Sequence, residues 1–106
     1  MVQYVTFPFA TERFPDELGA VVQTTVFNGT EPARLVVHTM DNSWLVGDGI
    51  NDPNLPGAAI AVHIRHLIDG DPTIEQLARL PLGCAATRSG RADAWEIYRH
   101  EWADEP

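Results

Sequence analysis

The segment Gly47–Asp52, which reads Gly-Asp-Gly-Ile-Asn-Asp, combines residue types that can hold a divalent cation beside a phosphate. The carboxylates of Asp48 and Asp52 are hard oxygen ligands of the kind that Mg²⁺ prefers. The glycines permit a loop to wrap closely around an ion. The apolar runs Trp44–Val46 and Ala58–Val62 on either side of the segment predict two strands that would position such a loop.

This segment resembles the fourth motif, GDGxND, of haloacid-dehalogenase-like phosphatases and P-type ATPases. The resemblance implies Mg²⁺-dependent phosphoryl transfer, with Asp48 and Asp52 helping to hold the ion. The nucleophile motif of that family, DxDx(T/V), is missing, because its nearest counterpart, Met40–Trp44, lacks the second carboxylate, and the chain contains no lysine. We interpret the segment as an acidic glycine- and proline-rich loop that coincides with the motif. A metal-dependent phosphohydrolase-like protein stays as an alternative.

His63 and His66 form a second candidate site, because helical spacing would place both imidazoles on one face with acidic residues nearby. No further cluster of metal ligands completes such a site in the sequence. A structural role is therefore the favoured interpretation, and we predict neither a metal nor another cofactor.

Cys84 is the one cysteine of the chain and follows Gly83 in an apolar stretch. Its context predicts a buried, inert thiol rather than a nucleophile. A single thiol excludes an intramolecular disulfide and suits a reducing compartment. No nucleophile elbow, P-loop or Cys-x-x-Cys pair is present, so no catalytic residue is predicted.

A wider pattern runs through the second half of the chain. It consists of Asp71–Ile74, then Pro81–Gly83, then Arg88 and Trp95, and it is preceded by the segment Asp41–Asp48. Together these read DP-x-I…P-x-G-x-x-x-x-R…(aromatic), after an upstream D-x-S-W…G-D.

This pattern is similar to that of a bacterial immunity-protein family that was first catalogued as a domain of unknown function and occurs beside polymorphic-toxin genes. The resemblance extends from about residue 20 to 98, with Ser43 in place of the family's glycine and Leu45 in place of its usual basic residue. It implies a non-enzymatic protein that neutralises a cognate toxin by occlusion. For binding a partner, the acidic loops nominate Asp41, Asp48 and Asp52, which we expect to be exposed, and the resemblance adds Trp44, Arg88 and Trp95.

These residues also have a structural interpretation that stays open. Trp44 and Trp95 can fill a core, and Arg88 can pair with an internal acid. An orphan domain that assembles as a homodimer is a further alternative.

The net charge of the chain limits the class of molecule that it can bind. The chain has 106 residues, enough for one domain spanning 1–106, and a net charge of −8. Such a field repels nucleic acid and anionic membranes, whereas it accelerates encounter with a basic protein. We expect no membrane span, because the longest apolar run is Ala58–Val62, and no secretory signal, because the N-terminus lacks a basic region followed by a long apolar run. We expect a cytoplasmic protein without a nucleic-acid or membrane partner.

The fold class that these elements predict is α+β, with a mostly antiparallel sheet of about five strands and two short helices. Asp71 and Pro72 predict the start of the second helix. The expected strands are 20–27, 34–40 and 44–46, which should form an antiparallel meander, followed by 58–62 and by a hairpin of 83–88 with 94–99. The expected helices are a turn at 63–68 and a helix at 72–79, and 47–57 is expected to be loop.

Overall fold

The computed structural model describes residues 7–9, 13–52 and 54–99. These described residues form one mixed sheet of six strands with three short helices, so the predicted α+β class is confirmed. The strands are β1 (Gly19–Gln23), β2 (Leu35–His38), β3 (Trp44–Gly47), β4 (Ala59–His63), β5 (Cys84–Thr87) and β6 (Glu96–Arg99). The helices are α1 (Thr24–Phe27), α2 (Arg65–Gly70) and the 3₁₀ helix η1 (Pro72–Leu77).

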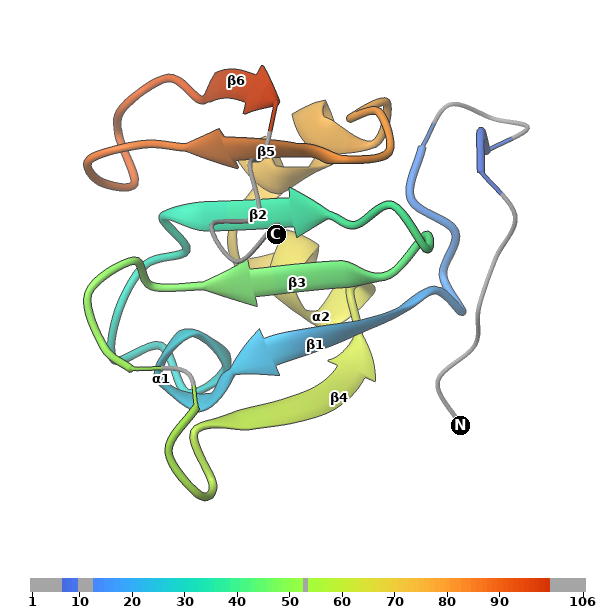
Figure 1. The fold of residues 1–106 in the computed structure, drawn as a ribbon. Helices are drawn as coiled ribbons and strands as arrows, with labels where there is room; N and C mark the ends of the chain where they lie inside the picture. Colours follow the sequence, from blue (N-terminus) through green and yellow to red (C-terminus); the bar gives the residue numbers. More distant parts are fainter. Residues whose placement is uncertain (1–6, 10–12, 53, 100–106) are drawn as a thin grey trace, which may run out of the picture.

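The strand order is β4-β1-β3-β2-β5-β6 (Figure 1). All neighbouring pairs are antiparallel except β1 and β3, which run parallel with Val21 opposite Leu45. The meander predicted for the first three strands is therefore wrong, because β3 lies between β1 and β2. The predicted hairpin of the last two strands is confirmed.

The region expected to be one strand at 20–27 divides into β1 and α1. The β-branched residues after Gln23 favour a strand locally, but α1 is held by tertiary contacts, with Val26 buried and the Thr24 N–H bound to the Ala58 carbonyl at 2.7 Å. Gly29, at a φ of 80°, ends the helix in the left-handed conformation that glycine adopts readily. The Asn28-Gly29 pair thus closes a helix rather than a strand.

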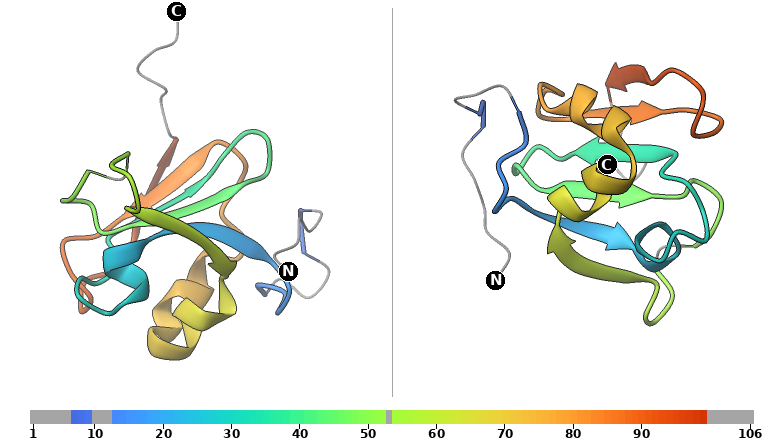
Figure 2. Two further views of the ribbon diagram at one scale, coloured as in Figure 1. Left: turned by 90° about the horizontal axis from the view of Figure 1, so that it is seen from below. Right: turned by 180° about the vertical axis from the view of Figure 1, so that it is seen from behind.

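Helices α2 and η1 cover one face of the sheet, and no helix among the described residues covers the opposite face (Figures 1 and 2). Alternation along the strands sends Val22, Val36 and Val46 into the helix-covered core. Asp71 caps η1, because its carboxylate accepts a hydrogen bond from the Thr73 N–H at 3.3 Å. The predicted helix start is confirmed, although the element is a 3₁₀ helix that ends at Leu77.

Aromatic side chains close one end of this core. Trp44 is fully buried, with its ring centroid 4.9 Å from that of Phe14 and 3.9 Å from the parallel ring of His38. The His38 ring nitrogens lie 2.6 Å from the Leu80 carbonyl and 2.7 Å from the Asn42 side-chain oxygen. The sequence of residues 1–18 also predicts a short strand followed by a loop or helical turn, and this prediction falls largely on residues 1–6 and 10–12, outside the described residues.

Candidate functional site

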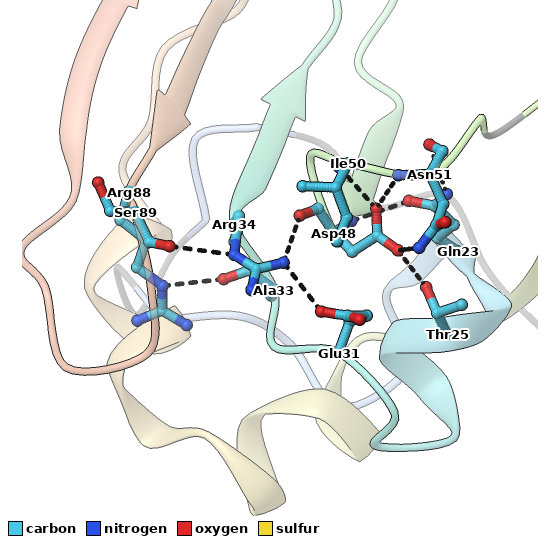
Figure 3. Close-up of polar contacts among 10 residues, drawn as sticks. All are labelled: Gln23, Thr25, Glu31, Ala33, Arg34, Asp48, Ile50, Asn51, Arg88 and Ser89. Atoms are coloured by element: carbon cyan, nitrogen blue, oxygen red, sulfur yellow. Dashed lines mark hydrogen bonds and ion pairs between the residues drawn. The ribbon is translucent and has the colours of Figure 1, made fainter.

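Asp48, in the predicted cation-binding loop, is fully buried, so the expectation that it is exposed is wrong. One carboxylate oxygen accepts the backbone N–H groups of Ile50 and Asn51, both at 2.9 Å. The other accepts the Thr25 hydroxyl at 2.5 Å and the Asn51 side-chain amide at 2.7 Å (Figure 3). Four donors therefore saturate the carboxylate, and Asp48 folds the loop rather than presenting a charge.

The protonation of Asp48 follows from these contacts. Burial alone would raise the pKa of the carboxyl group, but the hydrogen bonds from Asn51, Thr25 and Ile50 outweigh it and hold the pKa well below its ordinary value. The backbone N–H of Asp48 is also bound, at 2.8 Å, by the side-chain oxygen of Gln23. Asp48 thus joins α1 to the 48–57 loop through its carboxylate and is linked to β1 through its backbone N–H.

Arg34 links this loop to two others. Its guanidinium donates to the Asp48 carbonyl at 3.0 Å, to the Glu31 carboxylate at 3.1 Å and to the Ser89 carbonyl at 3.0 Å (Figure 3). Sequence reasoning did not single out Arg34 or Thr25, because neither belongs to a recognisable motif and both act across long sequence separations.

Arg88 is buried in a second polar cluster. It donates to the Asp71 carboxylate at 2.5 Å, to the Thr73 hydroxyl at 2.8 Å and to the Ala33 carbonyl at 2.8 Å. Its guanidinium carbon lies 4.0 Å from the ring centroid of Trp95, a cation–π arrangement. Three parts of the C-terminal pattern, Asp71, Arg88 and Trp95, therefore meet in space, where they join η1, β5 and the segment before β6.

The contacts within this cluster give Asp71, Arg88 and Trp95 a structural role in the fold. Burial would raise the pKa of Asp71, but hydrogen bonds from Thr73 and Arg88, with the charges of Arg88 and Arg91, lower it. The ion pair consequently keeps both charges inside the fold. Arg88 and Trp44 are buried and offer almost no surface to a partner, and Trp95 is half-buried.

Asp41 and Asp52 are exposed, so two of the six nominated residues lie fully at the surface. Hydrogen bonds, first that from the Thr39 hydroxyl, lower the pKa of Asp41. Asp52 accepts the Asn54 N–H at 2.9 Å, a bond within its own loop. These hydrogen bonds join the two carboxylates to Thr39 and Asn54, which are not among the nominated residues.

The remaining candidates assemble no centre among the described residues. The ring centroids of His63 and His66 lie 6.3 Å apart, and no group of three or more His, Cys, Asp or Glu side chains suitable for a metal ion is found in this part of the chain. Cys84 is half-buried rather than fully buried as predicted, because it lies at the start of β5, where core packing is partial.

The open face of the sheet, which carries no helix among the described residues, is a further candidate for a binding surface. A hollow of about 430 Å³ lies there, lined by apolar side chains of β1, β2 and β3, including Val21, Leu35 and Leu45, and by Asn51 and other residues of the 48–57 loop. The strand positions of this face carry one acid, Glu96, and no arginine within the described strands. Sequence reasoning missed the surface because it depends on the order of the strands.

Comparison of the chain with protein-family models, with curated proteins and with solved structures gives no match. Within the described ranges, no helix has both the length and the apolar character needed to cross a membrane.

The geometry around Asp48 predicts that Mg²⁺ does not bind the Gly47–Asp52 loop. About 10 mM MgCl₂ should shift the Tm by less than about 1 °C, because ligand binding raises stability only when the folded state has a free site. Thermal unfolding with and without Mg²⁺, with matched ionic strength, measures this. A saturable rise in Tm that Asp52→Asn removes would restore the phosphohydrolase alternative.

Proposed function

We propose that the chain is a non-enzymatic protein-binding domain that occludes a basic partner, with toxin neutralisation as the setting implied by the resemblance to immunity proteins. The open face of the sheet supports this proposal most directly. It is an apolar surface with a single acid in its strands, on a chain whose net charge is −8. Depletion of charge at the centre, with charge around it, is typical of protein-binding surfaces.

The surface continues onto the 48–57 loop. Ile50 and Leu55 are exposed there, at 64% and 59%, and Asp52 lies between them in sequence. In this proposal the apolar face forms the desolvated contact, while Asp52, Asp41 and the other exposed acids accelerate encounter with a basic protein. The buried Asp48 contributes indirectly, because its four hydrogen bonds fix the loop that borders the hollow.

The network that occupies Asp48 argues against the phosphohydrolase alternative. A carboxylate that already accepts four hydrogen bonds would have to give them up before it could coordinate a cation. Occlusion of a partner needs no catalytic group and is compatible with a rigid, fully bonded loop.

The test uses the protein encoded beside this gene as the candidate partner. The two proteins are produced together, and both their affinity and the protection of growth are measured. Val21→Glu should weaken binding by roughly 100-fold, because it places a charge in the centre of the apolar contact. Val21 is 44% exposed, so the Tm should change little.

Ile97→Glu is the matched control, since Ile97 is 57% exposed but faces the opposite side of the sheet on β6. It should leave the affinity unchanged. Absence of binding by the neighbouring product, or equal affinity of the Val21→Glu and wild-type proteins, would remove support from the proposal.

A further inference from the structure

The two edges of the sheet differ in how they are protected. Strand β4 lies at one edge and β6 at the other (Figure 1). The outer strand β6 carries Glu96 and Arg99, and charged residues on an edge discourage pairing with another chain. Strand β4 reads Ala-Ile-Ala-Val-His, without a proline, a lysine, an arginine or an acid. Strand β4 therefore lacks the residues that usually prevent an edge strand from pairing with another chain.

The register of β4 with β1 identifies which backbone groups face outward. The Thr24 N–H binds the Ala58 carbonyl at 2.7 Å, and the Ile64 N–H binds the Leu18 carbonyl at 2.9 Å. Because hydrogen-bonded pairs alternate along an antiparallel ladder, Ile60 and Val62 bond to β1. The N–H and C=O groups of Ala59 and Ala61 therefore point away from the sheet, along its open edge.

The strand at this edge and the strand beside it also carry no formally charged residue. No Asp, Glu, Lys or Arg occurs in residues 53–64, which contain β4, or in residues 18–30, which contain β1 and α1. A chain of net charge −8 repels its own copies, so self-association requires a contact region that is free of acids. The β4 edge meets this requirement, whereas the edge formed by β6 does not.

We propose that β4 pairs with β4 of a second copy of this chain, in an antiparallel arrangement about a two-fold axis through Ala61. Residues that lie opposite each other in an antiparallel pair point to the same face of the sheet. Under a two-fold axis, this requires one residue of the strand to lie opposite its own copy. Centring on Ala61 overlaps all five residues of the strand. It sets Ala61 opposite Ala61 and Ile60 opposite Val62 of the second copy.

The size and the charge of the β4 side chains are compatible with this pairing of two copies. Ala61 is exposed and small, so the closest side chains at the axis are two methyl groups. In this register the outward N–H and C=O groups of Ala61 face the same groups of Ala61 in the second copy, which produces a hydrogen-bonded pair at the axis. No charged side chain of β4 faces another. The open faces of the two sheets would then lie on the same side and form one continuous surface.

A second copy is favoured over a strand from a basic partner because β4 offers no acid to attract one. The two occupants also differ in their response to salt. Self-association works against repulsion between two chains of net charge −8, so screening should strengthen it. Binding of an oppositely charged partner would weaken under the same conditions.

Cysteine cross-linking tests the register directly, in a Cys84→Ala background. Ala61→Cys should form a disulfide-linked dimer on mild oxidation, because hydrogen-bonded pairs hold their Cα atoms about 5.5 Å apart and disulfides span about 4.4–6.8 Å. Ala59→Cys is the matched control on the same strand. In the proposed register its two copies lie roughly 14 Å apart along the strands, beyond the reach of a disulfide.

Sedimentation equilibrium of the wild-type chain supplies the second measurement. We expect a dimer that strengthens as salt rises from about 20 mM to about 0.5 M. Ala61→Lys should weaken it by roughly tenfold or more, because like charges would lie directly opposite each other, while the Tm of the dilute protein stays unchanged. A monomeric wild-type protein, equal cross-linking at positions 59 and 61, or a dimer that weakens with salt would each overturn the proposal.

Discussion

Replacing Arg88 with alanine should lower the free energy of unfolding by roughly 3–5 kcal/mol, the loss typical of a buried ion pair that is deprived of one partner. The change leaves the Asp71 carboxylate buried beside Thr73 without the cation that it pairs with at 2.5 Å. It also removes the hydrogen bond to the Ala33 carbonyl and the stacking on Trp95. Chemical denaturation at pH 7 measures the difference.

Arg13→Ala provides the control for this prediction. Arg13 forms an ion pair with Glu75 at 3.6 Å, but its side chain is 68% exposed, so the substitution should cost less than about 1 kcal/mol. Equal effects of the two substitutions would mean that the Arg88 cluster contributes no more than a surface pair. If Arg88→Ala instead weakened partner binding without lowering the Tm, Arg88 would be a recognition residue, as the family resemblance implies.

The features that the sequence predicts well are those determined by neighbouring residues. Asp71 and Pro72 start η1 because a side-chain cap and a fixed φ act within one turn. The final hairpin forms between β5 and β6 because two short strands flank Ser89 and Gly90. In both cases the interacting residues belong to one turn or to two strands that follow each other directly in the chain.

The features that were predicted wrongly depend on contacts between distant segments. The helix α1 replaces the end of a predicted strand, where the Thr25 hydroxyl reaches Asp48 and the Thr24 N–H reaches Ala58. The position of β3 between β1 and β2 likewise depends on its parallel pairing with β1, a strand distant in sequence. Asp48 was expected to be an exposed site residue for the same reason. The residues next to it in sequence do not indicate its contact with Thr25, which lies in a distant segment.

Replacing Asp48 with alanine should lower the free energy of unfolding by roughly 2–4 kcal/mol at pH 7, because the partly buried hydrogen bonds from Thr25 and Asn51 lose their charged acceptor. Asp48→Asn keeps an oxygen for the two backbone N–H groups and removes only the charge, so its effect should be smaller. Asp52→Asn is the control within the same loop. Its carboxylate is exposed and accepts one hydrogen bond, so its stability should stay within about 0.5 kcal/mol of wild type.

The effect of Asp48 should depend on pH in a defined direction. Its pKa in the folded protein lies below the ordinary value of 3.8, so the unfolded chain takes up its proton first as the pH falls. The stabilisation from the charged carboxylate is therefore complete well above pH 3.8 and declines as the pH falls below it. Denaturation curves from neutral pH down to about pH 3 should show the wild-type and Asp48→Asn proteins converging in stability. A constant difference across that range would mean that the carboxylate does not carry its charge in the folded state, and the four-donor network would then need a different explanation.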